Sequence, residues 1–202
     1  MVADPQPHVV TALRARGRER VEVDLDGRPW RVVPLEAVYA VGLSVGGAVD
    51  RTTARALGRE LRRLDAHAQA LRALRARDHT VASLEQKLAE WGAGPGVRRE
   101  ALEAAQRAGL VDDRRYARDR SSLLAARGAG DHLIAVDLEG HGVPGEHIRE
   151  MIGLLEPESE RAARIVATRG RTPRTARHLA AKGFSEDTLE TLVANLAADA
   201  ID

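Results

Sequence analysis

Three stretches of this sequence can be laid over one another, and this internal repeat constrains the fold more than any other feature. They are LRALRARDHTVASLEQKLAEWG from Leu71, SSLLAARGAGDHLIAVDLEGHGV from Ser121, and ARIVATRGRTPRTARHLAAKGF from Ala163. Each runs from a helix that ends in arginine, through a polar break, into a helix whose late leucine stands four residues before a glycine. The residues at these positions are Arg77, Arg127 and Arg169, then Leu88, Leu138 and Leu179, then Gly92, Gly142 and Gly183. A period of this length is typical of stacked helical repeats.

Each glycine is followed by a third predicted helix, over roughly residues 97–108, 144–155 and 185–197. Thr80, Thr172 and Ser185 are good N-cap residues, Pro173 suits a first helical position, and the three glycines suit the left-handed position after a helix. A unit of this size is too small to be very stable alone, so neighbouring units should stack. We therefore expect an elongated, curved array.

The amino-terminal part has a different pattern. In RERVEVDLDGRPWRVV, residues 18–33, apolar and charged residues alternate around Asp26-Gly27, which is the strongest short signal for a β-hairpin. A two-residue turn there predicts that Val23 faces Trp30, Val21 faces Val32 and Glu22 faces Arg31. Pro29 cannot donate to a ladder, so its strand should be an edge. A short helix is expected around 35–39, followed by a glycine-rich loop to residue 50.

The predicted fold is therefore mostly α, a tandem array of three three-helix repeats preceded by a small N-terminal β-hairpin. From Arg51 the leucines recur at helical spacing, in a helix that could run to Arg77. The predicted segments are 1–50 with the hairpin, 51–109 with a basic helix and the first repeat, 110–156 with the second repeat, and 157–202 with the third repeat and an acidic tail.

Composition excludes several classes of function. Cysteine is absent, which excludes disulfides, thiolate metal sites and cysteine nucleophiles. No apolar run reaches the roughly 18 residues that a membrane span needs, and the first residues do not resemble a secretion signal. We expect a cytoplasmic protein, monomeric and without a membrane partner.

Charge is strongly segregated although the net charge is only +1. Residues 51–77 hold eight arginines against two acids, 161–182 are purely basic, and 131–160 are mostly acidic. Such a surface suits a partner that carries both signs, such as a protein that holds DNA. Arginine also suits bidentate recognition of phosphate and carboxylate, although a charged run is often only a solvated face. The candidate binding residues are Arg51, Arg55, Arg59, Arg62, Arg72, Arg75, Arg171, Arg174, Arg177 and Lys182.

Adjacent acids, Asp112 and Asp113, are the strongest candidates for chemistry. They stand where a helix should begin, and an aspartate there accepts hydrogen bonds from free backbone N–H groups, so we interpret them as structural. A catalytic site would need a second group of residues, and none is identifiable. Asp137, His141 and His147 have a weak metal-like spacing. GAGPG lacks the rest of a phosphate loop, and Ser121 and Ser122 have no adjacent base. We predict no catalytic residue, no metal site, no cofactor and no enzyme.

The same segment carries a family resemblance. Its motif residues are Leu110, Val111, Asp112, Asp113, Tyr116 and Ala117, followed by Arg127, Gly130, Ile134, Leu138, Gly142 and Val143. This pattern resembles the central repeat of RecX, the bacterial regulatory protein of the RecA recombinase, and the similarity covers about residues 65–197. Lys182-Gly183-Phe184 matches the close of the family's third repeat. Gly140 and His141 depart from the family pattern, which usually has a good helix former and a basic residue there.

The resemblance implies a protein that binds the RecA–DNA filament and lowers its ATPase and strand-exchange activity, thereby regulating DNA repair and recombination. Single-stranded or double-stranded DNA is a further possible partner. It also implies that Asp112, Asp113, Tyr116, Leu138 and Gly142 are structural motif residues. An alternative is an independent helical DNA-binding module, similar to a helix-turn-helix domain, that does not act through RecA. Against this alternative, no unit carries the residue set expected for base reading.

Overall fold

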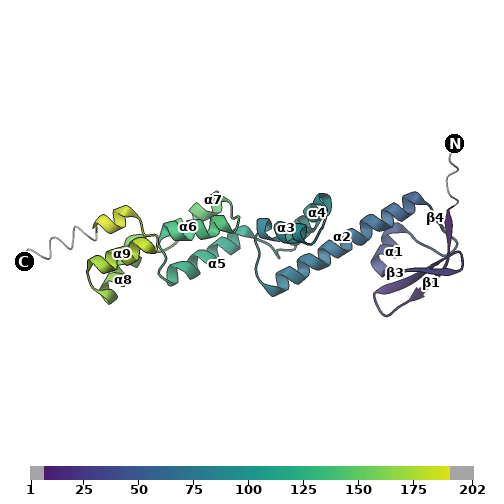
Figure 1. Ribbon diagram of the computed structural model, residues 1–202, viewed down its shortest axis with the longest axis horizontal. Coiled ribbons are helices and arrows are strands. Elements are labelled where there is room, and N and C mark those ends of the chain that lie inside the picture. Colours follow the sequence, from purple (N-terminus) through teal and green to yellow (C-terminus); the bar gives the residue numbers. More distant parts are fainter. Residues whose placement is uncertain (1–6, 192–202) are drawn as a thin grey trace, which may run out of the picture. The chain divides into compact units, whose positions relative to one another are not determined.

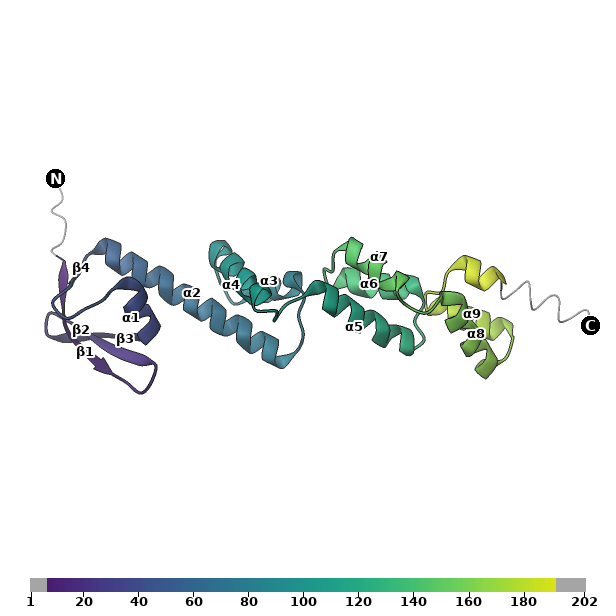
Figure 2. The same cartoon turned by 180° about the vertical axis from the view of Figure 1, so that it is seen from behind.

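The computed structural model describes residues 7–191 and is mostly helical, with a small sheet near the amino terminus (Figures 1 and 2). It forms two compact units, Met1–Arg72 with Leu88–Ala104, and Ala73–Lys87 with Ala105–Asp202. The predicted fold class, helices preceded by a β-hairpin, is confirmed. The boundaries of the four predicted segments and the curved form of the array stay predictions.

The predicted hairpin is present as part of a four-stranded antiparallel sheet in the order β3-β2-β1-β4. Asp26 and Gly27 form its turn with φ values of 49° and 79°, as the Asp-Gly signal requires. The strand with Pro29 is an edge, as predicted. The other edge strand and its neighbour were not predicted from the sequence. The strands are β1 (His8–Ala15), β2 (Arg20–Leu25), β3 (Arg28–Pro34) and β4 (Ala48–Val49).

The predicted register of the hairpin is wrong by one residue. Val21 lies opposite Val33 and Val23 lies opposite Arg31, but the next residue, Asp24, lies opposite Pro29. Trp30 is therefore an extra, unpaired residue, which makes a β-bulge. Because of this shift Val33 is the buried residue of β3, while Trp30 and Val32 are about 40% exposed.

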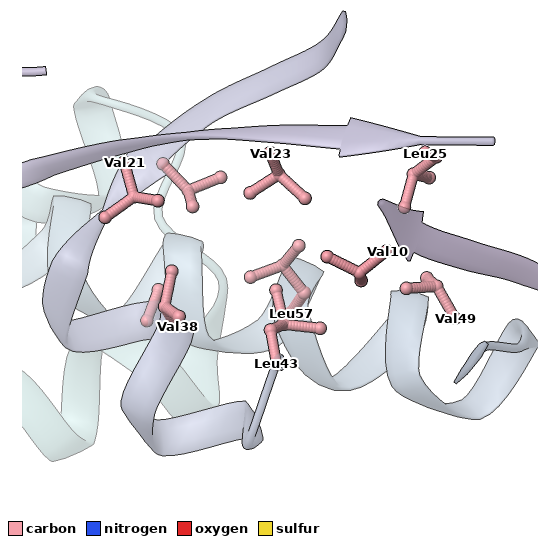
Figure 3. Close-up of a cluster of buried hydrophobic side chains, with 10 residues drawn as sticks. Val10, Val21, Val23, Leu25, Val38, Leu43, Val49 and Leu57 are labelled. Carbon is pink, nitrogen blue, oxygen red and sulfur yellow. The ribbon is translucent and has the colours of Figure 1, made fainter. Parts of the chain in front are cut away.

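The core of the first unit lies between this sheet and two helices. Helix α1 (Leu35–Val41), which the sequence predicted, contacts β2 and β3 and contributes Val38. Figure 3 shows Leu57 of α2 (Arg51–Ala76) pointing toward Val23 and Val10 of the sheet. These apolar side chains fix the start of α2 against the sheet, and their burial is the main stabilising contribution in this unit.

Helix α2 buries different faces along its length. Its first half buries Leu57, with Leu61 and Leu64 packed around the sheet core. Further along, the buried residues are alanines, Ala66 and Ala70. At about 100° per residue these alanines lie on the opposite side of the helix from the leucines. The side of α2 that faces solvent in the first half of the helix is therefore the buried side further along.

The second unit contains the second and third predicted repeats. Helices α5 (Asp113–Ala126), α6 (Asp131–Gly140) and α7 (Gly145–Gly153) contact one another around Ile134, Leu138 and Ile148 (Figure 1). Helices α8 (Glu158–Arg169) and α9 (Pro173–Ala181) contact each other around a second cluster with Val166, Leu179 and Phe184. After a break, residues 186–191 form a further helix, and the rest of the predicted helix over 185–197, with the acidic tail, lies outside the described residues.

The helix boundaries follow the predicted signals. Thr80 and Thr172 accept hydrogen bonds from the backbone N–H groups of Ser83 and Thr175, and Gly92, Gly142 and Gly183 have φ between 73° and 82°. The remaining predicted helices are α3 (Val81–Glu90) and α4 (Pro95–Arg107).

Candidate functional site

The adjacent acids Asp112 and Asp113 have two different structural roles. Asp112 is the N-cap of α5, where its Oδ1 accepts a hydrogen bond from the backbone N–H of Arg115 at 3.0 Å. That hydrogen bond holds the pKa of the Asp112 carboxyl below its usual value. Asp113 instead reaches another helix, because its Oδ1 accepts a hydrogen bond from the backbone N–H of Val81 at 2.8 Å.

The contact of Asp113 belongs to a joint between repeats, which we call the first joint. The Thr80 hydroxyl donates to the carbonyl oxygen of His141 at 2.6 Å. Gly142 approaches so closely that an added Cβ would lie 2.5 Å from the Cβ of Ala82. The start of α3, the start of α5 and the end of α6 therefore meet here, within the second unit.

Equivalent positions build a second joint between the second and third repeats. Glu158, the first residue of α8, accepts hydrogen bonds from the backbone N–H groups of Asp131 at 2.8 Å and Ser185 at 3.0 Å. The N–H of Gly130 donates to the carbonyl oxygen of Lys182 at 2.8 Å. An added Cβ on Gly130 would lie 2.3 Å from the backbone of Gly183.

Arg161 fixes the second joint from inside. Its side chain is 4% exposed, and its guanidinium donates to the carbonyl oxygen of Ala129 at 2.6 Å and to the carboxylate of Asp131. It also lies over the ring of Phe184 at 5.9 Å. Arg161 belongs to the third repeat, and Ala129 and Asp131 belong to the second, so these contacts bind the two repeats together. Removing Asp131 would leave the buried charge of Arg161 without compensation.

The other motif residues are also structural. Leu138 is completely buried, and Tyr116 is half-buried with its ring 5.8 Å from that of His141. Asp137 accepts two hydrogen bonds from Arg120, at 2.7 and 2.8 Å, so both of its oxygens have a cationic partner. This ion pair accounts for Asp137, whose spacing to His141 had a weak metal-like character.

A row of exposed arginines marks the first half of α2. Arg51, Arg55, Arg59 and Arg62, called the α2 stripe below, lie within about 80° of one another around the helix. They point away from Leu57 and the sheet core. Arg55, Arg59 and Arg62 have no ion pair with any residue of 7–191.

Neighbouring Arg63, unlike Arg55, Arg59 and Arg62, forms ion pairs within the fold. It lies on the packed side of α2 and donates to the carboxylates of Glu36 at 2.9 Å and Glu60 at 2.7 Å. The structure therefore separates one structural arginine from the stripe, a distinction that the sequence pattern did not give. Arg72 and Arg75 are exposed too, but they lie on a different side of the helix from the stripe.

The predicted basic residues of the third repeat also differ in position and exposure. Arg174 and Arg177 are exposed on α9, one turn apart. Arg171 is exposed in the segment before the helix, and Lys182 is half-buried as the C-cap. The α2 stripe lies in the first unit and this group lies in the second, so each is a separate candidate surface.

Small helical repeats joined at fixed contacts define a helical repeat protein, with exposed arginines on its surface. A regulatory protein RecX of Halorhodospira halophila is 35% identical over 135 residues, which are 62% of this chain and 84% of the relative. A regulatory protein RecX of a Mycobacterium species is 37% identical over 108 residues, or 52% of this chain and 58% of the relative. This chain belongs to the RecX family of regulatory proteins.

Solved structures agree with this assignment at the level of the fold. A crystal structure of regulatory protein RecX superposes with a TM-score of 0.77 at 20% identity, covering 93% of this chain and 99% of that chain. RecX from Lactobacillus salivarius gives a TM-score of 0.59 at 18% identity, covering 68% and 97%. No family model matches the chain. Among the helices of the described residues, none combines the length and apolar character needed to span a bilayer.

Proposed function

We propose that this protein binds the RecA–DNA filament and lowers its ATPase and strand-exchange activity, thereby regulating recombination and repair. The observation that carries the proposal is the 35% identity to a regulatory protein RecX across 84% of that relative. Filament binding would place the protein in the cytoplasm, where we expect it to act as a monomer.

The arginines are the residues that we assign to binding. Arg55, Arg59 and Arg62 are exposed and have no internal ion pair in the described chain, so a partner can use their charges without breaking a contact of the fold. The α2 stripe extends for about 16 Å along the helix, given about 1.5 Å of rise per residue. A row of this length fits a repeating anionic partner, either DNA phosphates or acidic side chains on successive RecA protomers.

The joints support the proposal in another way. Hydrogen bonds at Asp113 and Glu158 attach each repeat to the one before it. Fixed joints would hold neighbouring repeats in register with the successive protomers of a helical polymer. We assign residues 51–109, 110–156 and 157–202 to the three repeats on this basis.

Charge reversal tests the assignment. Arg174→Glu with Arg177→Glu, and separately Arg55→Glu with Arg59→Glu, should each weaken inhibition of ATP hydrolysis by preformed RecA filaments on single-stranded DNA. The control is Arg118→Glu with Arg149→Glu, which changes the net charge equally on exposed residues of α5 and α7. The control should inhibit like the wild type. Unchanged inhibition by both test variants at moderate salt would reject these surfaces.

An independent DNA-binding module would give a different result. Such a protein would bind a short duplex with sequence preference and show no affinity for the filament. The same variants would then lose duplex binding, and ATP hydrolysis by RecA would not change at any protein concentration.

A further inference from the structure

Trp30 is placed at the surface by an irregularity in the sheet. It is the extra residue of β3 opposite Val23 and Asp24, and it is 41% exposed. Bulges redirect a side chain out of the regular alternation, and they are common next to functional sites. A tryptophan exposed in this way forgoes much of the stabilisation that burial of its ring would give.

Two open hollows adjoin the Trp30 ring, and both are also lined by His8 and Leu25. The larger has a volume of about 490 Å³ and is bounded further by Arg28 and Pro29. The smaller, of about 200 Å³, reaches the start of α2 at Arg51 and Ala54.

The charges around the ring favour an anionic ligand. The guanidinium of Arg31 lies 5.9 Å from the centre of the Trp30 ring, and Arg28 lines the larger hollow. The acids beside them are already engaged. Asp26 accepts a hydrogen bond from the backbone N–H of Val9 at 2.9 Å and contacts His8 at 2.6 Å, and Asp50 accepts one from the N–H of Thr53 at 2.7 Å.

The smaller hollow is continuous with the α2 stripe, because Arg51 belongs to both. Arg55 and Arg59 follow at intervals of about 6 Å along the helix axis. An exposed aromatic ring next to a row of arginines is the arrangement by which proteins bind single strands, with a base stacked on the ring and phosphates on the cations.

We propose that Trp30 stacks a base of single-stranded nucleic acid whose phosphates follow the α2 stripe. A duplex does not fit equally well, since its bases are stacked on one another and would have to be flipped out to reach the ring. The proposal shares the α2 stripe with the function proposed above, but the contact with Trp30 needs no RecA, so it can fail separately from that function.

Tryptophan fluorescence tests this proposal directly. Trp30 and Trp91 are the two tryptophans of the chain, so Trp91→Phe leaves Trp30 as the reporter. We expect a thymidine oligonucleotide, added without RecA at low salt, to quench the Trp30 emission. A duplex of the same length should give much less quenching. No quenching at any oligonucleotide concentration would overturn the proposal.

Substitutions distinguish the contribution of the Trp30 ring to oligonucleotide binding from the contribution of the arginines. Trp30→Ala should weaken binding of a labelled oligonucleotide by about tenfold or more, and Trp30→Phe by less, because a smaller ring still stacks. Trp91→Ala is the matched control, since Trp91 is also 41% exposed, and it should bind like the wild type. Equal losses for Trp30→Ala and Trp91→Ala would contradict a specific site. Thermal unfolding of each variant shows whether it has folded.

Arg55→Glu with Arg59→Glu should lower the affinity and the salt dependence of oligonucleotide binding, while the quenching at saturation remains. A deletion of residues 2–6 tests whether the chain's own amino terminus fills the hollows instead. If that deletion changes the Trp30 emission and the oligonucleotide does not, the proposal is wrong. If the oligonucleotide does not quench Trp30 in a protein that still inhibits RecA, the Trp30 site is refuted and the function proposed above is not.

Discussion

The carboxylate of Asp113 accepts a hydrogen bond at 2.8 Å from the backbone N–H of Val81, which lies 32 residues earlier in the chain. Likewise, the carboxylate of Glu158 accepts a hydrogen bond at 2.8 Å from the backbone N–H of Asp131, which lies 27 residues earlier. In both joints, an acid that begins one repeat satisfies the N–H at the start of the middle helix of the repeat before it. A helix start leaves such N–H groups without an intrahelical partner, so this contact stabilises both the helix and the stacking.

Asp113 and Asp112 should therefore differ when each is replaced. Asp113→Ala leaves the partly buried N–H of Val81 without its partner and should lower the free energy of unfolding by about 1–3 kcal/mol. Asp112→Ala removes an N-cap and should cost about 1 kcal/mol. Urea unfolding measures both changes. Amide hydrogen exchange at Val81 should rise in the Asp113 variant only, and equal exchange in the two variants would contradict the joint.

Gly130 and Gly140 lie at the two ends of α6, and replacing each by alanine should change the free energy of unfolding in opposite directions. Gly130→Ala places a Cβ 2.3 Å from the backbone of Gly183, although its own φ of −79° suits any residue. The strain should lower the free energy of unfolding by about 1–3 kcal/mol. Gly140 has nothing within 4 Å of an added Cβ, so Gly140→Ala should stabilise the protein by up to about 1 kcal/mol. Thermal unfolding of the two variants compares them, and stabilisation by Gly130→Ala would be inconsistent with a tight second joint.

Acid should weaken the second joint through Glu158. Burial alone would raise the pKa of Glu158, but hydrogen bonds from the Ser185 hydroxyl and from the N–H groups of Asp131 and Ser185 outweigh it, so the pKa lies below the usual 4.5. Because the folded pKa is depressed, this stabilisation is complete above pH 4.5 and is lost as the pH falls through the folded value. Glu158→Gln should be less stable near neutral pH and should lose less stability on acidification. Urea unfolding across this pH range tests the prediction, and parallel curves for both proteins would argue against it.

Arg161 and Arg164 lie three residues apart on α8 and should behave differently. Arg161→Met removes the buried guanidinium that donates to the carbonyl oxygen of Ala129 and to Asp131, and leaving these acceptors without their donor should cost about 1–3 kcal/mol. Arg164 is exposed and contacts Glu156 at the surface, so Arg164→Met should change the free energy of unfolding much less. Chemical denaturation separates the two, and similar losses would show that the burial of Arg161 does not matter.

Local signals in the sequence predicted much of the fold. The Asp26-Gly27 turn, the caps at Thr80 and Thr172, and the buried Leu138 depend on neighbouring residues or on helical spacing, so the sequence displays them directly. Strand β1 was missed because HVVTALRA alternates poorly and a bulge interrupts its pairing with β2 between Val10 and Ala12. A bulge shifts a register without any marker in the sequence, which is why Trp30 was predicted to face Val23.

The candidate binding surface was predictable only in part. Helical spacing placed Arg55 and Arg59 on one face, but it could not show that Arg63 is held by Glu36, which lies 27 residues earlier. Nor could it show that α2 exchanges its buried face between Leu57 and Ala70. The role of Asp113 depends on a contact 32 residues away, so the sequence indicated a structural residue without its partner.

The most direct test of the central claim is sedimentation of preformed RecA filaments on single-stranded DNA with increasing amounts of this protein, with ATP hydrolysis followed in the same mixtures. We predict saturable co-sedimentation together with a fall in hydrolysis. A protein that stays in the supernatant and leaves hydrolysis unchanged, while binding a short duplex on its own, would contradict the account.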